Sequence, residues 1–313
     1  MTVIGIDIGG TNTRLAMVSA SGEILDQRAV PTNSDRGSEF AIAQLSQLIE
    51  TIATESASAL SGIGVAVTGP VDHRTGVVDN PYTLKGWGPT DLITPLAQRF
   101  GVPVRIENDA NAAALGERWC GAGASAARLA VITIGTGIGV GLAVDGQVQR
   151  DEHGRHGEAG HHILDPHGPR CYCGARGCWE VLAAGPALVR LAREQLRAEY
   201  GEETSLEHGQ IADAVISAAL AGRPRETQVV EEIAGWIGRG LVNTIAFFGP
   251  GTIVIGGGVG ARCFPLISPT INAVLEQHRA MIPTDVQVLP AATGDDAGVL
   301  GAAFAALHNQ TET

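Results

Sequence analysis

The fold is decided by a short repeat that reads IDIGGTNTRLA at residues 6–16 and ITIGTGIGVGLA at residues 132–143. Each copy has an apolar run, a glycine turn and a second apolar run, which predicts two β-strands joined by a tight turn. The copies align with Asp7 opposite Thr133. Short patterns of this kind also recur by chance, but a hairpin repeated so far along one chain favours two domains built on the same plan.

Strand patterns alternate with helical periodicity around both copies of the repeat. We expect strands at residues 3–8, 15–18, 23–30, 62–67, 102–106, 129–134, 140–144, 252–255 and 286–289. We expect helices at residues 38–56, 90–99, 110–120, 186–199, 210–221, 226–247, 264–278 and 297–307. This alternation predicts an α/β fold. We assign residues 1–120 and the C-terminal segment 297–313 to a smaller domain, and residues 121–296 to a larger one.

Composition and charge exclude several classes of protein. The 313 residues include 21 basic and 33 acidic side chains, a formal net charge of −12, which argues against nucleic acid or an anionic membrane as a partner. Lys85 is the only lysine and lies outside every glycine-rich loop, so a P-loop nucleotide site is excluded and a pyridoxal enzyme is disfavoured. The N-terminus lacks the features of a signal peptide, and we expect a cytoplasmic protein.

The glycine turns are suited to hold phosphate groups, because backbone N–H groups converge where no side chain intrudes. Two such turns predict a nucleoside triphosphate bound between two domains. Asp7 lies in an apolar strand, where a carboxylate needs a partner, and we assign it Mg²⁺ bound through water. Alternatively, Asp7 accepts hydrogen bonds within its turn, and Thr11 and Asn12 are turn residues only. The proposed nucleotide-binding positions are Asp7, Gly9, Gly10, Thr11, Asn12, Thr133, Gly135, Thr136, Gly137, Gly256, Gly257 and Gly258.

The third glycine element, residues 256–258, follows a predicted strand and precedes a helix, which suits a ribose or an adenine lying against bare backbone. Together with Ala261 it also matches the dinucleotide fingerprint, so an NAD-dependent dehydrogenase is the second class of enzyme to consider. Against that class, Glu276, which stands about twenty residues further on, falls in a predicted helix rather than at the end of the next strand.

A candidate general base follows the strand predicted at residues 102–106. Asn108 and Asp109 stand at its carboxyl end, where open α/β sheets bind their ligands. A carboxylate there can accept the proton of an attacking hydroxyl group while Mg²⁺ and backbone amides stabilise the transferred phosphoryl group. The alternative is that Asp109 only caps the helix that begins near Ala110.

Three cysteines within eight residues, Cys171, Cys173 and Cys178, predict a metal site, because Gly174 and Gly177 let the backbone fold around one ion. One further ligand completes a tetrahedral zinc site. A filled site of this kind has no open position for water, so we interpret the zinc as structural. Spacing alone does not choose the fourth ligand among His161, His162 and His167. The isolated Cys120 and Cys263 are expected to be buried small hydrophobic residues.

Four segments resemble those of a known family: IGIDIGGTNTRLAMV, IENDANAAALGE, ITIGTGIGVGL and GEAGHHILDPHGPRCYCGARGCWE. They are similar to the signature segments of the ROK family (repressors, open reading frames, kinases), and the resemblance spans most of the chain. It implies the two-domain actin-like ATPase fold, of the ribonuclease H-like type, with an active-site cleft between the domains. It also implies ATP-dependent phosphorylation of a hexose at its 6-hydroxyl, with Asp109 as the base.

The resemblance assigns further roles to individual residues. It selects His161 as the fourth zinc ligand, and the cofactors it implies are ATP, Mg²⁺ and structural Zn²⁺. The helical segment 186–247 is a candidate subunit interface, and we expect a homodimer or homotetramer. The implied sugar contacts are Asn80, Asn108, Asp109, Glu158, His161 and Glu180.

The resemblance leaves alternatives open for the substrate and the activity. ROK regulators carry a winged helix-turn-helix before the kinase-like core, and a first strand near residue 3 leaves no room for one. A sugar-responsive regulator is therefore disfavoured. A catalytically inactive sugar-binding module is disfavoured because the matched base and phosphate turns are all present. Glucose is the first choice of substrate. The segment DPHGP and the long spacing from Asn80 to Trp87 keep N-acetylmannosamine and N-acetylglucosamine as alternatives.

Overall fold

A computed structural model describes residues 1–56, 59–152, 157–201, 204–283 and 285–308 of the chain. It divides into two compact units. Unit 1 comprises Met1–Val131, Gly141–Gly157 and Ala292–Thr313, and unit 2 comprises Ile132–Val140 and Glu158–Ala291. These bounds differ from the residues 120 and 296 expected from the sequence, because the segment Gly141–Gly157 returns to unit 1.

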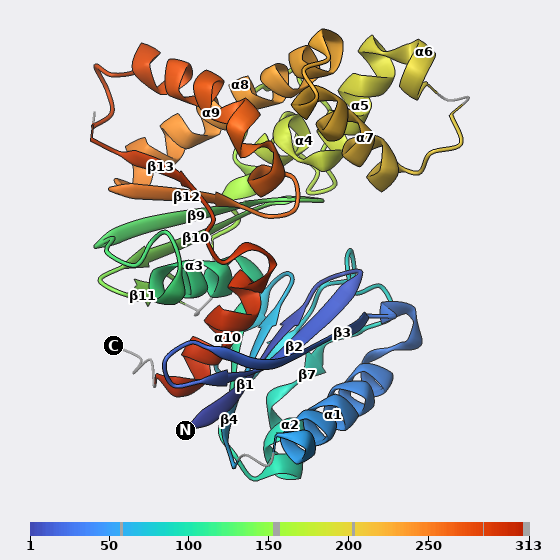
Figure 1. The fold of residues 1–313 in the computed structure, drawn as a ribbon, viewed down its shortest axis with the longest axis vertical. Coiled ribbons are helices and arrows are strands. Elements are labelled where there is room, and N and C mark those ends of the chain that lie inside the picture. Colours follow the sequence, from blue (N-terminus) through green and yellow to red (C-terminus); the bar gives the residue numbers. More distant parts are fainter. Residues whose placement is uncertain (57–58, 153–156, 202–203, 284, 309–313) are drawn as a thin grey trace. The chain divides into compact units, whose positions relative to one another are not determined.

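The first sheet lies in unit 1 and has the strand order β3-β2-β1-β4-β8 (Figure 1). Strand β1 pairs antiparallel with β2 and parallel with β4, and β4 pairs parallel with β8. The strands span Thr2–Ile8 (β1), Asn12–Ser19 (β2), Ile24–Pro31 (β3), Leu60–Val67 (β4) and Val104–Asn108 (β8). The carboxyl ends of β1, β4 and β8 therefore meet at one edge of this sheet.

The second sheet repeats the plan of the first. Its order is β11-β10-β9-β12-β13, so a hairpin again leads into parallel strands. The strands span Arg128–Ile134 (β9), Ile138–Val144 (β10), Gln147–Val148 (β11), Thr252–Gly256 (β12) and Gln287–Pro290 (β13). The two glycine turns of the sequence repeat connect β1 to β2 and β9 to β10, so they occupy equivalent places in the two sheets.

Helices cover both faces of the first sheet. The helices α1 (Ser38–Glu55) and α2 (Ile93–Phe100) pack on one face through a core that includes Ile4, Ile49 and Leu96. The helices α3 (Asp109–Cys120) and α10 (Ala297–Leu307) lie on the other face. A small sheet is formed by β5 (Val71–Asp72), β6 (Val77–Val78) and β7 (Thr90–Asp91), and 3₁₀ turns occur at η1 (Ser34–Arg36) and η3 (Gly294–Asp296).

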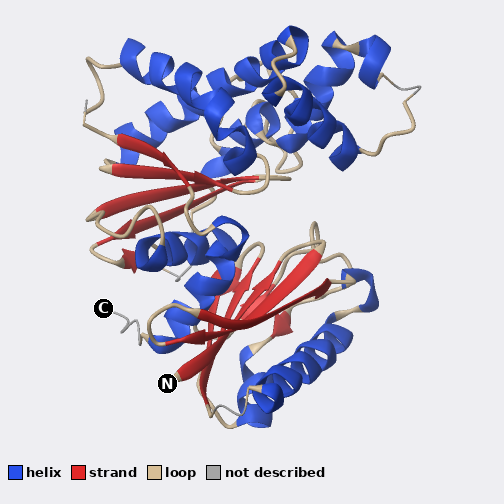
Figure 2. Cartoon of the chain, in the orientation of Figure 1, coloured by secondary structure: helices blue, strands red, loops and turns tan. Residues whose placement is uncertain are grey.

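Unit 2 is rich in helices, which gather on one side of β12 and β13 (Figure 2). They are α4 (Trp179–Ala183), α5 (Gly185–Gln195), α6 (Arg197–Tyr200), α7 (His208–Leu220), α8 (Pro224–Phe248) and α9 (Gly260–Gln277), with a 3₁₀ turn η2 (Ala159–His161). Helix α8 ends at Gly249, which has the left-handed φ of 55°. Among the described residues, no helix is both long and apolar enough to cross a membrane.

Three predicted helices, at residues 90–99, 186–199 and 264–278, differ from the structure by three or more residues at one end, and the last of them begins at Gly260. The helix expected at residues 90–99 begins at Ile93, because Thr90–Asp91 forms β7 and the Asp91 carboxylate accepts hydrogen bonds from Ile93 N and Thr94 N. The helix expected at residues 186–199 is broken at Leu196, whose φ of −118° and ψ of 46° are not helical. The start of α2 and the end of α5 are thus set by local side-chain and backbone geometry, which hydrophobic periodicity does not predict.

The backbone of helix α10 is in direct contact with the glycines of strands β1 and β4. A Cβ atom added to Gly64 would lie 1.8 Å from Ala302 O, and one added to Gly5 would lie 2.2 Å from Val299 O. A Cβ on Gly301 would similarly lie 1.7 Å from Ala112 O in α3. Only glycine permits this approach, so α10 is held between the sheet and α3 by shape rather than by long side chains.

We predict that Gly64→Ala lowers the free energy of unfolding of the protein by about 3 kcal/mol, because the new methyl group meets backbone that cannot rotate away. Urea unfolding measures the change. Gly235→Ala is the control, since this helical glycine faces only the Arg239 guanidinium at 3.7 Å, and it should be neutral or stabilising by up to about 1 kcal/mol. Equal stabilities of the two variants would contradict the packing argument.

Candidate functional site

The first glycine turn joins β1 to β2 and leaves its backbone accessible. Gly9 N donates to Asn12 O at 3.0 Å, which closes the turn, and Thr32 Oγ1 donates to Gly9 O at 2.7 Å. Thr11 and Asn12 are exposed. Gly10 must remain small, because a Cβ there would lie 2.4 Å from Thr83 Cγ2. The exposed part of the turn at Thr11 and Asn12 therefore offers backbone N–H groups to a ligand.

Asp7 lies next to this turn, in strand β1, and its carboxyl group is in an unfavourable environment for a charge. Burial and the nearby Asp109 carboxylate raise the pKa of Asp7 to about 7, and Asp295 adds to the shift. Arg14, which lies opposite Asp7 in β2, acts against the shift but also forms an ion pair with Asp295 at 2.8 Å. A cation near Asp7 and Asp109 would relieve this repulsion.

Asp109 is the first residue of α3, and the helix is capped by its neighbour. Asn108 Oδ1 accepts hydrogen bonds from Ala110 N at 2.9 Å and Asn111 N at 3.2 Å, so Asn108 is the N-cap residue. Asp109 Oδ1 accepts from Asn108 Nδ2 at 3.0 Å and from Ala110 N at 2.8 Å. The alternative in which Asp109 caps this helix is therefore wrong, since the chain turns into the helix one residue earlier.

The loop that follows β4 brings Asn80 close to Asn108. Asn80 Nδ2 donates to Thr68 O at 3.0 Å, and Asn108 Nδ2 donates to Gly69 O at 3.1 Å. Both amides are therefore fixed on two consecutive carbonyl groups. Unit 1 thus gathers three of the residues that the resemblance assigns to the sugar, Asn80, Asn108 and Asp109, beside Asp7.

Glu107 was missed by the sequence analysis. Its carboxylate is buried in β8, where it accepts hydrogen bonds from Asn111 Nδ2 at 3.0 Å and from Arg150, while His73 Nε2 lies 3.1 Å away. Burial by itself would raise the pKa of Glu107, but His73, Arg150 and Asn111 together lower it. The Glu107 carboxylate is therefore charged and is surrounded by hydrogen-bond and ion-pair partners. These contacts fix the end of β8, where Asn108 lies.

In unit 2, the second and third glycine turns meet at the end of β9. Gly135 N donates to Gly137 O at 3.0 Å within the second turn. Gly257 has a left-handed φ of 79°, and a Cβ there would lie 2.5 Å from Ile134 O. The third turn therefore needs glycine for conformation and for close approach. Glu276 lies inside α9, as expected, and the dinucleotide interpretation gains no acidic residue from it.

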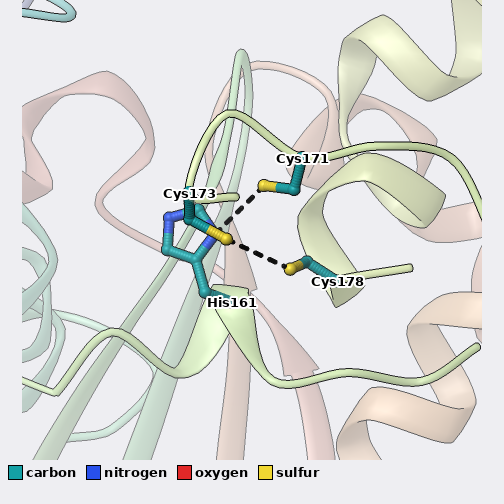
Figure 3. A group of neighbouring side chains, drawn as sticks. All are labelled: His161, Cys171, Cys173 and Cys178. Carbon is teal, nitrogen blue, oxygen red and sulfur yellow. Dashed lines mark hydrogen bonds between the residues drawn. The ribbon is translucent and has the colours of Figure 1, made fainter. Parts of the chain in front are cut away.

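The three cysteines of the metal motif come together with His161 (Figure 3). His161 Nδ1 lies 3.5 Å from Cys171 Sγ, and Cys173 Sγ lies 3.6 Å from Cys178 Sγ. All four potential ligand atoms lie within 4.8 Å of one another. This donor set fits a tetrahedral zinc ion of the Cys₃His type.

The other cysteines and histidines have different surroundings. His162 Nδ1 is hydrogen-bonded to Ala159 O at 2.5 Å, and its ring packs on Trp179. The sulfur cluster found among the described residues contains neither His162 nor His167. Cys263 is buried, as expected, but Cys120 is exposed. The expectation for Cys120 is wrong because it is the last residue of α3, where the helix leaves the core.

Glu180 links the metal loop to the second glycine turn. Its Oε2 accepts a hydrogen bond from Ile138 N at 3.0 Å, directly after the turn. Burial is the main cause that raises the pKa of Glu180, and the exposed Glu158 adds to it, while His161 acts against the shift. Tyr172, which the sequence analysis did not single out, lies beside them, with its hydroxyl oxygen 3.0 Å from His161 Nε2.

Comparison with known proteins gives a consistent set of relatives. The profile of the ROK family matches residues 3–309. A glucokinase of Halalkalibacterium halodurans is 32% identical over 95% of this chain and 92% of its own. An N-acetylmannosamine kinase of Escherichia coli O7:K1 is 30% identical over 98% of this chain and 99% of its own.

A solved structure extends the comparison to the fold. The ROK family glucokinase from Streptomyces griseus, in complex with glucose and AMPPNP, superposes with a TM-score of 0.82 at 31% identity, over 98% of this chain and 99% of that chain. This similarity, together with the two sheets of equal order, confirms the two-domain actin-like α/β fold that the sequence resemblance implied.

We predict that Asp7→Asn stabilises the protein above pH 7. Between about pH 4 and pH 7 the folded wild type holds a proton that the unfolded chain has lost, so its free energy of unfolding falls as the pH rises through this window. In magnesium-free buffer at pH 8 the variant should be more stable by on the order of 2 kcal/mol, and the difference should vanish near pH 4.

Urea unfolding across this pH range measures the difference. Asp72→Asn is a control of opposite sign, because hydrogen bonds from Arg74 N and Thr75 N lower the pKa of Asp72, and its stabilising effect is present above the ordinary carboxyl pKa. An Asp7→Asn variant with the same pH dependence as the wild type would contradict the electrostatic description of the site.

Proposed function

The chain belongs to the ROK family, and on that premise we propose that it is an ATP-dependent sugar kinase, which transfers the γ-phosphate of ATP to the 6-hydroxyl group of a hexose. The observation that carries the proposal is the position of Asp109. Its carboxylate is held at the carboxyl end of β8, where it accepts a hydrogen bond from Asn108, and it is close enough to Asp7 to raise the pKa of that residue. A sugar hydroxyl could donate its proton to Asp109 there, and a bound cation could interact with Asp7 and Asp109.

The chemistry assigned to unit 1 follows from these groups. Asp109 accepts the proton of the attacking hydroxyl, and the amides of Asn80 and Asn108 orient the sugar. The backbone N–H groups of the turn Gly9, Gly10, Thr11 and Asn12 hold phosphate oxygens. Asp7 is the residue that would hold Mg²⁺, which when bound neutralises charge on the transferred phosphoryl group.

The residues of unit 2 have a complementary role in the proposal. The second turn, Thr133 and Gly135–Gly137, takes phosphate oxygens, and Gly256–Gly258 accommodates the ribose or adenine, since bare backbone leaves room for both. Glu158, His161 and Glu180 contact the sugar. Glu180 connects the two functions, because it is bonded to the backbone directly after the second turn.

The cluster of His161, Cys171, Cys173 and Cys178 would hold one Zn²⁺ ion with a structural role. All four positions of a tetrahedral ion are filled by the protein, which leaves none for substrate or water. The ion would stabilise the loop between η2 and α4, and it would thereby fix the orientation of His161 and the position of Glu180 at the start of α4.

Glucose is the proposed acceptor, because glucokinases are among the relatives that match nearly the whole chain. N-acetylmannosamine, supported by a kinase of similar identity, and N-acetylglucosamine are the alternative acceptors. Pocket shape and a few hydrogen bonds decide between a hydroxyl and an acetamido group. The homodimer or homotetramer and the cytoplasmic location expected from the sequence stay predictions.

We predict that Asp109→Asn lowers kcat by about 10²- to 10⁴-fold, because the amide cannot accept the sugar proton. ADP release is measured with glucose, mannose, N-acetylglucosamine and N-acetylmannosamine. The variant should keep helix α3 folded, since Asn108 caps it. Retained turnover, or a wild type that no sugar stimulates, would contradict the proposal.

We also predict one zinc ion per chain and a loss of sugar affinity when the ion is removed. Metal analysis measures the content, and a strong chelator should lower the Tm and raise the KM for the sugar about tenfold or more, with recovery on adding zinc. Cys120→Ser, which changes an exposed cysteine outside the cluster, should keep its zinc. A metal-free protein with unaltered Tm and KM would contradict the structural role.

A further inference from the structure

Tyr172 stands between two cysteines of the metal cluster and turns its phenol ring towards the proposed sugar site. Its ring meets the imidazole of His161 edge to face, with centroids 5.0 Å apart and an interplanar angle of 87°. The hydroxyl oxygen lies 3.0 Å from His161 Nε2. Burial raises the pKa of the Tyr172 phenol, and the nearby Glu180 carboxylate adds to this shift. The hydroxyl group thus contacts His161 and lies close to Glu180, two of the three residues of unit 2 that the proposal assigns to the sugar.

The direction of each hydrogen bond follows from the chemistry of the groups. The nearby Glu180 carboxylate can only accept, which favours a Tyr172 hydroxyl whose single proton points towards it. Tyr172 must then accept from His161, and His161 Nε2 carries the proton. This leaves Nδ1 of His161 without one, on the side that faces Cys171 Sγ at 3.5 Å, which is the tautomer that a zinc ligand requires.

A sugar hydroxyl would use the same two partners in the same way, donating to a carboxylate and accepting from an imidazole N–H group. His161 Nε2 has one proton, so it serves one acceptor at a time with good geometry. Glu180 Oε2 is already bonded to Ile138 N. The Tyr172 hydroxyl and a sugar hydroxyl therefore compete for one position.

The side chain of Tyr172 can leave this position without disturbing the metal loop. Tyr172 is 59% exposed, whereas the neighbouring Cys171 is buried. The loop backbone is closed by hydrogen bonds from Cys171 N to Ala175 O and from Gly174 N to Cys171 O, neither of which involves the phenol. Rotation about the side-chain bonds alone would move the ring into solvent.

We propose that, in the sugar-free protein, the Tyr172 hydroxyl occupies the place of an acceptor-sugar hydroxyl between His161 and Glu180, and that the sugar must displace it in order to bind. This inference rests on the proposed function. It makes Tyr172 a residue that sets sugar affinity and selectivity. A sugar with a hydroxyl at the matching carbon replaces the hydrogen bond to His161 Nε2, whereas a sugar without that group leaves His161 Nε2 unpaired if the phenol departs.

The test is Tyr172→Phe, which keeps the ring and removes the competing hydroxyl. Calorimetric titration with glucose in the absence of nucleotide should show a Kd lowered about three- to tenfold, the range expected for one hydrogen bond. The KM for glucose should fall in parallel, while the KM for ATP and the zinc content stay the same. A panel of monodeoxy glucoses extends the test, and one member should lose most of this gain.

Tyr200→Phe is the matched control, because the Tyr200 hydroxyl is likewise hydrogen-bonded to a side chain, Glu226 at 3.4 Å, but in the helical part of unit 2. It should leave the Kd for glucose unchanged. A Kd that rises or stays constant in Tyr172→Phe overturns the inference, since a rise would mean that the hydroxyl contacts the sugar rather than competes with it. A gain shared equally by every deoxy sugar overturns it as well.

These outcomes separate the inference from the proposed function. A wild type that binds glucose but phosphorylates no sugar contradicts the kinase proposal, while the titration of Tyr172→Phe still decides the inference. A wild type that binds none of glucose, mannose, N-acetylglucosamine and N-acetylmannosamine overturns both. An active wild type with a Tyr172→Phe variant of equal Kd overturns the inference alone.

Discussion

The parallel pairing of β1, β4 and β8 is the constraint on which the candidate site depends. In this register Ile8 lies opposite Val67, and Val67 lies opposite Asn108. The residues that follow these three positions therefore emerge at one edge of the sheet, and they include the first glycine turn, the loop that anchors Asn80, and Asp109. A shift of one residue in any of the three strands would turn the side chains to the other face and separate them.

The same register explains why two neighbouring carboxylates behave in opposite ways. Asp7, Ala66 and Glu107 lie in one row, on the face covered by α3 and α10. Glu107 is surrounded by His73, Arg150 and Asn111, and its pKa is lowered; Asp7 has like charges near it, and its pKa is raised. The charge of Glu107 is thus balanced by partners within the protein. The charge of Asp7 is not balanced in this way, and a bound cation would supply the missing positive charge. Electrostatic strain of this kind is common at functional sites.

Unit 2 uses the repeated hairpin differently. Its glycine turn is supported from outside the sheet, through Glu180 and the loop that carries the cysteines. An ion bound by His161 and the three cysteines would stabilise this loop. Tyr172 lies between Cys171 and Cys173 of this loop, so an ion bound to both cysteines would restrain its backbone and leave only its side chain free to respond to a ligand.

The sequence by itself determined the alternation of strands and helices, the repeated glycine turn, the metal motif and the family. These features rest on local patterns and spacing, such as the apolar run that ends at Gly9 or the three cysteines within eight residues. Tertiary structure alone decided that Asn108, rather than Asp109, caps α3, that helix α2 begins at Ile93, and that Glu107 and Tyr172 lie beside residues of the candidate site. Each of these features depends either on contacts between segments that are distant in the sequence or on the backbone conformation of one residue. Local sequence patterns do not specify such contacts or such conformations.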